Sequence, residues 1–130
     1  MGSFKDLIAY KKSFELAMDI FVLSKKFPQE EKYSLTDQIR RSSRSVSACI
    51  AESYRKRRYE AHFISKLTDA DMENSETEVW LDFALRCGYI SDLENQNLIL
   101  RVNEVGKLIN YMIANPEKFM SSNTTRKVAN

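Results

Sequence analysis

The sequence predicts an all-α protein folded as an antiparallel up-down four-helix bundle. Apolar residues recur at helical spacing in four long segments, and short connections join these segments. Only three Gly and two Pro occur in 130 residues, and both prolines lie where a helix is expected to end. A chain of this length forms one domain. We therefore expect a single bundle domain over residues 1–120 and a flexible polar tail over residues 121–130.

The first two helices are bounded by a proline and by a pair of polar residues. The first helix is expected over about residues 6–26 and ends at Phe27, because Pro28 disfavours helical conformation in the residue before it. The second is expected to begin near Ser34, which has the spacing of a capping pair with Asp37, and to run to about residue 54.

The last two helices are bounded by a glycine, a capping box and a second proline. The third helix is expected over about residues 59–87 and stops at Gly88, since glycine readily adopts the left-handed conformation that ends helices. Ser91 and Glu94 form a capping box at the start of the fourth helix, which ends before Pro116.

The first and third helices each carry apolar side chains on two opposite faces. With about 100° between successive residues, one face of each helix is assigned to the bundle interior. These interior faces comprise Leu7, Tyr10, Phe14, Ala17, Met18 and Phe21, and then Phe63, Leu67, Ala70, Leu81, Ala84 and Leu85.

The second apolar faces need another explanation, because a four-helix bundle has one interior. We expect them to pack against other copies of the chain. The alternative is one broad buried stripe on each helix, with some aromatic rings lying flat on the surface. The expected interface comprises Leu16, Ile20, Leu23, Phe27, Met72, Val79, Trp80 and Phe83.

The second helix and the turn after it are strongly basic. From Arg40 to Arg58 there are seven basic residues and one acid, Glu52, which gives a local charge of +6. Such a stretch can follow a phosphate backbone, since arginine offers paired N–H donors. The candidate nucleic-acid-binding residues are Arg40, Arg41, Arg44, Arg55, Lys56, Arg57 and Arg58.

The alternative for this basic stretch is pairing within the protein. The third helix carries six acids and no basic residue between Asp69 and Asp82, so the two helices have complementary charges. Arg41 lies in mid-helix and suits pairing, whereas residues 55–58 lie at an end of the bundle and stay accessible. The pattern leaves both interpretations open.

Residue patterns typical of enzymes and metal sites are missing from the sequence. The single histidine, His62, lacks the Glu-x-x-His spacing of di-iron bundles, and no glycine-rich phosphate loop or nucleophile motif occurs. Asn74 and Thr77 fall on the inner face of the third helix and are expected to hydrogen-bond within the core. We therefore expect no catalytic residue, no metal and no cofactor.

Cysteine usage and hydropathy bear on location in the cell. Cys49 and Cys87 fit no metal or disulfide motif and are expected to be buried, reduced thiols. The sequence has neither a signal-peptide core nor an apolar run of membrane length. We expect a cytoplasmic protein without a membrane partner.

Several segments resemble a known family. They are F-K-D-L-I-A-Y-K-K-S from Phe4, F-P-Q-E-E-K-Y-S-L-T-D-Q-I-R-R-S from Phe27, I-A-E-S from Ile50 and S-E-T-E-V-W-L-D-F-A from Ser75. Over residues 4–113 the chain resembles the bacterial four helix bundle proteins, first named for intervening sequences of large-subunit ribosomal RNA genes. The family pattern S-I-P-x-N-I-A-E-G is S-V-S-A-C-I-A-E-S here, so Cys49 stands at the position of the family's asparagine.

The resemblance implies an architecture and an assembly rather than a reaction. The family is similar to the accessory protein of diversity-generating retroelements, a pentameric barrel with a basic surface that works with a reverse transcriptase and its RNA template. By that resemblance we expect a homopentamer, with RNA or DNA and a reverse transcriptase as partners. A ring fits the two apolar faces, because it needs two distinct contact surfaces on each subunit.

Two functions therefore remain. The first is a non-enzymatic, ring-forming homo-oligomer that acts as a nucleic-acid-binding or adaptor protein. The alternative is a purely structural or protein-interaction oligomer that binds no nucleic acid. They differ in whether the arginines of the second helix are exposed or are paired with the acids of the third.

Overall fold

The observed helices agree with those expected from the sequence. The structure is a computed structural model that describes residues 2–120, so the tail expected over residues 121–130 lies outside the described residues. Each α-helix begins and ends within about two residues of its expected bounds. The α-helices are α1 (Ile8–Ser24), α2 (Leu35–Arg55), α3 (Glu60–Arg86) and α4 (Asp92–Ala114), with short 3-10 helices η1 (Phe4–Asp6), η2 (Gln29–Glu31) and η3 (Pro116–Lys118).

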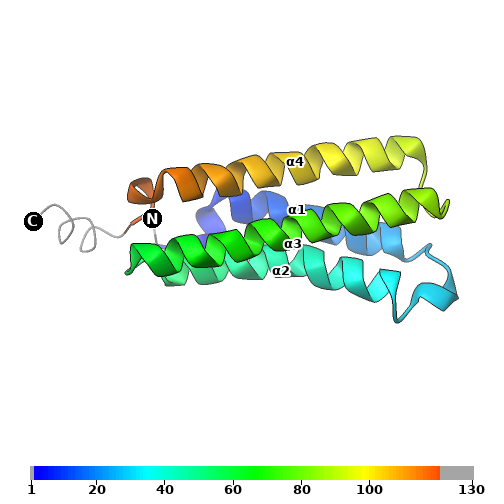
Figure 1. Cartoon of the computed structure of the whole chain (residues 1–130), viewed down its shortest axis with the longest axis horizontal. Helices are drawn as coiled ribbons and strands as arrows, with labels where there is room; N and C mark the ends of the chain where they lie inside the picture. The colour runs from blue at the N-terminus through cyan, green and yellow to red at the C-terminus, as the bar shows by residue number, and fades with distance from the viewer. Residues whose placement is uncertain (1, 121–130) are drawn as a thin grey trace, which may run out of the picture.

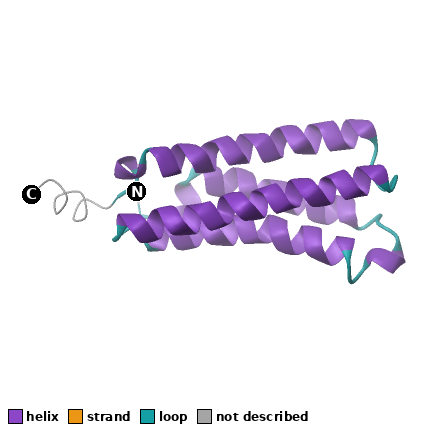
Figure 2. Cartoon of the chain, in the orientation of Figure 1, coloured by secondary structure: helices purple, strands orange, loops and turns teal. Residues whose placement is uncertain are grey.

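The four α-helices of the described chain form an antiparallel bundle. Figure 1 shows successive helices running in opposite directions along one long axis, and α1 also packs against α4. The η2 loop and the α3–α4 turn lie at one end, whereas the N-terminal segment, the α2–α3 turn and η3 lie at the other. Residues 2–120 form helices and loops without a strand (Figure 2), which confirms the all-α class. No helix in this range combines the length and apolarity needed to cross a membrane.

The expected boundary between α3 and α4 is confirmed in detail. Gly88 has a φ of 78°, and the backbone N–H of Tyr89 donates to the carbonyl of Ala84 at 2.9 Å, as in a Schellman motif. At the start of α4, Ser91 Oγ accepts from the N–H of Glu94 at 3.0 Å, and the Glu94 carboxylate accepts from the N–H of Ser91 at 2.9 Å. Local sequence therefore fixes this turn.

The start of α2 differs from the expectation. Ser34 is the N-cap, but its side chain caps no backbone N–H, so the expected pairing with Asp37 is wrong. Instead the carboxylate of Glu31 in η2 accepts from Ser34 Oγ at 2.6 Å and from the N–H of Leu35 at 3.2 Å. Its second oxygen accepts from the hydroxyl of Tyr89 at 2.8 Å. Glu31 thereby ties the η2 loop both to α2 and to the α3–α4 turn.

These hydrogen bonds shift the pKa values of Glu31 and Tyr89. Hydrogen bonds from Ser34 and Tyr89 and from the backbone of Leu35 lower the pKa of Glu31, because each favours the ionised carboxylate. The bond to Glu31 raises the pKa of Tyr89 to about 12. The loop is thus held by a charged acceptor rather than by packing alone.

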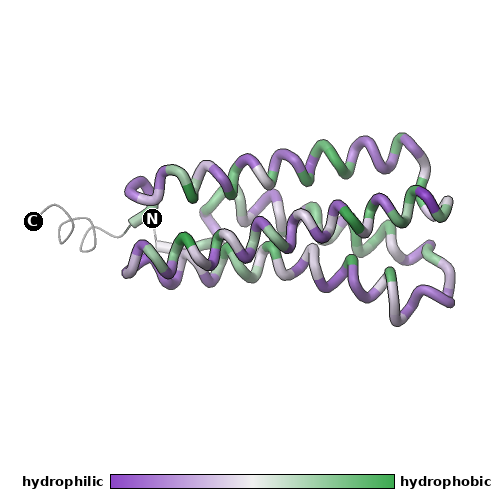
Figure 3. Tube along the Cα trace, in the orientation of Figure 1, coloured by the Kyte–Doolittle hydropathy of each residue, from purple (hydrophilic) through white to green (hydrophobic). Residues whose placement is uncertain are grey.

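Side chains from all four helices fill one core. Figure 3 shows hydrophobic positions recurring along each helix. Burying a large aliphatic or aromatic side chain contributes about 1.5–3 kcal/mol. The core therefore holds the bundle together to a greater extent than its surface charges do. The fully buried large side chains include Ile20, Ile39, Ile50, Phe63, Leu67, Leu81 and Ile109.

The face of α1 that was expected to contact another copy belongs to the core of the chain itself. Leu16, Ile20 and Phe27 are buried, and Leu23 is partly buried against the same core. The expectation of an interface is therefore wrong for Leu16, Ile20 and Phe27, and for Leu23 it stays a prediction.

Small residues explain which face of α1 turns inward. The face with Phe14 and Met18, assigned to the interior by apolar spacing, is exposed at these positions. The buried face carries Ser13, whose Oγ lies 2.9 Å from the Oγ of Ser47 on α2. A serine at this position lets the two helices approach closely. When both faces of a helix are apolar, apolar periodicity does not show which face is buried. Here the small residues determine the buried face.

The outer face of α3 is exposed as expected. Met72, Val79 and Phe83 are exposed, and Trp80 is half-buried with its indole N–H donating to Glu76 at 3.3 Å. Contact between this face and another copy stays a prediction.

Hydrogen-bonded polar side chains lie inside the bundle. Ser42 Oγ of α2 lies 2.8 Å from Thr77 Oγ1 of α3, and the amide nitrogen of Asn74 donates to the carbonyl of Val102 on α4 at 3.0 Å. Asn74 and Thr77 are therefore core residues, as expected. Of the cysteines, Cys49 is buried, whereas Cys87 was wrongly expected to be buried and is exposed at the end of α3.

Candidate nucleic-acid interface

The seven candidate basic residues do not form one continuous stripe. Arg41 reaches toward α3, Arg40 and Arg44 reach toward α1, and residues 55–58 lie around the turn between α2 and α3. Arg44 and Arg55 are separated along α2 by about 16 Å, at 1.5 Å per residue. The residues expected to form one site therefore lie in two separate basic regions, apart from Arg41, which is paired within the protein.

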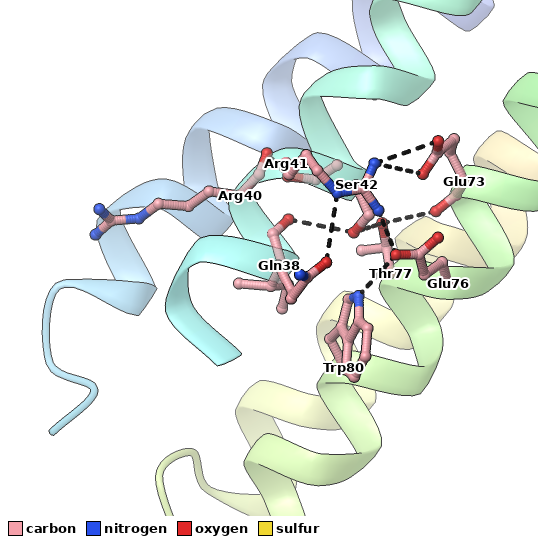
Figure 4. A network of polar contacts seen from close by, with 10 residues as sticks. Gln38, Arg40, Arg41, Ser42, Glu73, Glu76, Thr77 and Trp80 are labelled. Atoms are coloured by element: carbon pink, nitrogen blue, oxygen red, sulfur yellow. Dashed lines mark hydrogen bonds and ion pairs between the residues drawn. The ribbon is translucent and has the colours of Figure 1, made fainter. Parts of the chain in front are cut away.

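Arg41 is paired with acids of α3. Its Nη1 lies 3.3 Å from Glu73 Oε1, and its Nη2 donates to Glu76 (Figure 4). The bond to Glu76, which also accepts from Trp80, is the main cause of the raised pKa of Arg41. The prediction that Arg41 pairs within the protein is confirmed. Two carboxylates compensate its charge, so Arg41 is a weak candidate for contact with phosphate.

The other acids of α3 do not neutralise the rest of α2. Lys66 lies 3.7 Å from Asp69 of its own helix and 3.5 Å from Glu52 of α2. Asp71 accepts from the amide of Asn110 on α4 at 3.1 Å. Arg40 and Arg44 form no ion pair within residues 2–120, so the expectation of helix-to-helix pairing holds for Arg41 but not for them.

Arg40 and Arg44 lie against an aromatic ring of α1. Figure 4 shows Arg40 pointing away from the Arg41 network, and its Nε donates to Ser24 Oγ at 2.7 Å. The guanidinium carbons of Arg40 and Arg44 lie 4.7 and 5.4 Å from the centre of the Phe21 ring, and Lys25 Nζ lies 4.9 Å from it. A cation–π contact at an exposed site is worth about 0.5–1 kcal/mol. It positions these cations without neutralising them.

These basic side chains line an open groove over α2. The groove encloses about 620 Å³, and a second hollow of about 230 Å³ shares three of its lining residues and extends to Lys25 and Pro28. Lys25, Lys32, Arg40 and Arg44 form no ion pair within residues 2–120, so the charge of the groove is positive. We call this surface, together with Lys25 of the adjoining hollow, the basic groove; its residues are Lys25, Lys32, Tyr33, Thr36, Asp37, Arg40, Arg41, Arg44, Ser45 and Ala48.

The second basic region surrounds the α2–α3 turn. Arg55, Lys56 and Arg58 are exposed, whereas Arg57 is half-buried with its guanidinium carbon 3.7 Å from the centre of the Tyr54 ring. Burial lowers the pKa of Arg57, and its Nη1 is buried without a hydrogen-bond partner among the described residues. Arg57 therefore packs against the bundle, and the other three are the accessible cations.

The chain is similar to known proteins in sequence and in fold. The model of the 23S rRNA-intervening sequence protein family matches residues 5–111, which is well over half of the chain. The chain belongs to this family. It is also similar to a crystal structure from Bacteroides thetaiotaomicron, a protein of unknown function from the S23 ribosomal protein family. The two are 33% identical with a TM-score of 0.75, over 85% of this chain and 98% of that chain. No curated protein matches.

Membership of the 23S rRNA-intervening sequence proteins confirms the family resemblance seen in the sequence motifs. It also agrees with the observed bundle, since the similar crystal structure covers 85% of this chain with a TM-score of 0.75. Neither comparison names a reaction. Within residues 2–120 of this family member, no group of three or more His, Cys, Asp or Glu side chains is placed to hold a metal ion.

Sequence reasoning missed several residues of the basic groove. Lys25, Lys32 and Tyr33 lie outside the second helix, in the end of α1 and the connection that follows it. Helical periodicity assigns no face to a connection, so it could not place them beside Arg40 and Arg44. The available signal was the neighbouring basic and aromatic pair Lys32-Tyr33 immediately before the expected cap Ser34.

Proposed function

We propose that this 23S rRNA-intervening sequence protein is a non-enzymatic homo-oligomer that binds nucleic acid through its basic groove and through the exposed cations at the α2–α3 turn. One observation carries the binding proposal. Lys32, Arg40 and Arg44 line an open groove and form no ion pair within residues 2–120. Arginine binds phosphate oxygens through paired N–H donors. Several such cations along one surface can neutralise phosphates of a nucleic-acid backbone.

The chemistry of the site favours backbone recognition over base-specific readout. Its charged groups are mainly lysine and arginine, and contacts from these groups to phosphates fix position without reading sequence. We therefore expect sequence-tolerant binding that weakens steeply as salt is added.

Salt dependence tests this proposal directly. The variant Lys25→Ser, Lys32→Ser, Arg44→Ser removes three groove cations but keeps Arg40, whose side chain bonds Ser24. The slope of log affinity against log salt should flatten by about 2 to 3, at about 0.7 per phosphate on single strands and 0.9 on duplex DNA. Fluorescence anisotropy with labelled RNA and DNA measures this slope.

A matched variant controls for total charge. Lys5, Lys11 and Lys107 are exposed and lie outside the basic groove, so replacing all three by Ser removes the same charge elsewhere. This variant should keep most of the wild-type slope. An equal flattening in both variants would show that net charge, rather than the groove, governs binding.

The homo-oligomeric part of the proposal rests on two exposed apolar stripes. They lie on different helices, so each subunit offers two distinct contact surfaces, as a closed ring requires. The family resemblance implies a ring of five copies. The stripes comprise Phe14, Met18 and Val22 on α1, and Met72, Val79 and Phe83 on α3.

Charged substitutions within the stripes test the assembly. Val22→Asp and Val79→Asp should each dissociate the oligomer, because they place an unpaired charge in every contact. Both side chains are exposed in the single chain, so the helix content should be unchanged. Leu93→Asp, on the exposed surface of α4, is the control and should leave the oligomer intact. Light scattering that finds a wild-type monomer at micromolar concentration would contradict the proposal.

The exposed stripes also support a second candidate function, a purely structural or protein-interaction oligomer. This candidate is favoured if the oligomer forms but neither RNA nor DNA binds at low salt. The basic groove would then serve solubility or contact with an acidic protein.

A further inference from the structure

Tyr33 has an unusual position for a large aromatic side chain. It lines the basic groove, and at 85% exposure it is the most exposed large hydrophobic side chain among residues 2–120. Its described ring contact is with Lys32, whose Nζ lies 5.3 Å from the ring centre. Most of the tyrosine ring is therefore open to the groove and to solvent.

The backbone that carries Tyr33 is nevertheless held in place. Its neighbour Ser34 donates to the Glu31 carboxylate at 2.6 Å, and the N–H of Leu35 donates to the same oxygen at 3.2 Å. The second carboxylate oxygen of Glu31 accepts from Tyr89 of the α3–α4 turn, at the same end of the bundle. An exposed ring on a fixed backbone loses little conformational freedom when a flat partner packs on it.

The other aromatic ring beside the groove cannot serve the same purpose. Phe21 is half-buried, and three cations, from Lys25, Arg40 and Arg44, already lie near its ring. Phe21 organises the positive charges, whereas Tyr33 offers a free flat surface beside them.

From this arrangement we infer that the basic groove takes a single strand of nucleic acid and that Tyr33 stacks on one of its bases. The inference rests on the proposed nucleic-acid binding and names its ligand class. A cationic groove with an exposed aromatic ring is how proteins hold single strands without sequence preference. In a duplex the base faces are already stacked on one another, so the Tyr33 ring would gain no partner.

The spacing along α2 supports a strand that runs along the helix. Tyr33 precedes Arg40 by seven residues, and Arg40 precedes Arg44 by one helical turn, about 6 Å. A base on Tyr33 would therefore be followed along the strand by phosphates near Arg40 and then near Arg44.

The experiment compares strands with and without bases. Binding is measured at low salt for thymidine and uridine strands of about 12 nucleotides, for an abasic strand of the same length, and for a duplex. The proteins are the wild type, Tyr33→Ser, Tyr33→Phe and the control Tyr111→Ser. Tyr111 is another exposed tyrosine with a lysine near its ring, on α4 and outside the groove.

The expected result is specific to bases. Tyr33→Ser should weaken binding of both base-bearing strands by about 5- to 150-fold, which is the usual range for one stacked base. It should leave the affinity for the abasic strand unchanged, because the phosphate contacts remain. Tyr33→Phe and Tyr111→Ser should bind like the wild type. Thermal unfolding of Tyr33→Ser should match the wild type, since the side chain contributes little to the core.

Three outcomes would overturn the inference. One is an equal loss on base-bearing and abasic strands, which would leave the phosphate-binding proposal intact but remove the stack. Another is duplex binding as tight as single-strand binding with no effect of Tyr33→Ser. The third is a change in oligomer mass in Tyr33→Ser, which would place the ring in a protein contact. If no strand binds even the wild type, the proposed function itself fails.

Discussion

Replacing Arg41 or Arg44 of α2 by methionine should have opposite effects on stability and on nucleic-acid affinity. Arg41 lies 3.3 Å from Glu73 and donates to Glu76, whereas Arg44 lies 5.4 Å from the Phe21 ring centre and has no carboxylate partner within residues 2–120. Arg41→Met should therefore lower stability with little effect on nucleic-acid affinity. Arg44→Met should lower affinity with little effect on stability.

The magnitudes follow from the exposure of the partners. An exposed ion pair contributes about 0.2–1 kcal/mol, and the side chain of Glu73 is only 24% exposed, which favours the upper part of that range. Removing Arg41 also leaves Glu73 and Glu76 unpaired one turn apart, a repulsion worth about 0.2–0.5 kcal/mol. Because Arg41 has two such ion pairs, with Glu73 and with Glu76, Arg41→Met should cost about 1–2 kcal/mol in total. The loss for Arg44→Met should stay below about 0.5 kcal/mol, because a methionine sulfur near the Phe21 ring, worth about 0.3–1.5 kcal/mol, offsets the lost cation–π contact.

Thermal unfolding and binding on the same two proteins check this pair of predictions. A loss of about 1–2 kcal/mol should lower the melting temperature by several degrees for a domain of this size. Protein concentration is held constant, because assembly makes the midpoint concentration-dependent. High salt should reduce the stability difference for Arg41→Met by screening. Equal stability of the two variants, or a flatter salt slope for Arg41→Met than for Arg44→Met, would refute the division of roles.

Two further predictions concern the turns. Gly88→Ala should lower the free energy of unfolding by about 1 kcal/mol, because Gly88 has a φ of 78°, which alanine disfavours. An added Cβ would meet open space, so the penalty comes from backbone conformation alone. Gly88→Asn should cost less in the same urea titration, and equal costs would argue against a left-handed residue at this position. Glu31→Gln should reduce the acid sensitivity of folding. The folded pKa of Glu31 is lowered, so its stabilising contribution is present above the unfolded pKa of about 4.3 and is lost as pH falls through the folded value. Urea unfolding at several pH values should show the wild type and Glu31→Gln converging in acid, and parallel curves would contradict this.

The sequence was sufficient to predict the fold because its boundaries are local. Pro28 stops α1, Gly88 takes the left-handed conformation, and Ser91 with Glu94 caps α4, so each of these ends depends on a few neighbouring residues. The cap of α2 shows the limit of this approach. The Glu31 carboxylate reaches Ser34 because the chain forms the 3-10 helix η2 just before α2. The residue spacing around Ser34 did not predict this short helix.

The candidate site was only partly predictable for a related reason. Complementary charge on two helices indicated that Arg41 would be paired, and it is. The face of α1 could not be chosen from apolar spacing, because Ser13, a small polar residue, determines it by allowing close approach to α2. Tyr33 lies in a connection, and only the folded chain brings it beside Arg40.

The even number of helices has a practical consequence for handling the molecule. The N-terminal segment and η3 lie at the same end of the bundle as the α2–α3 turn, far from the η2 loop that carries Lys32 and Tyr33 (Figure 1). A bulky domain fused to either end of the described chain would stand beside Arg55 and Lys56 and leave the basic groove uncovered. A fusion partner at either end can therefore obstruct the cations at the α2–α3 turn while the basic groove stays open, without altering a residue in either region.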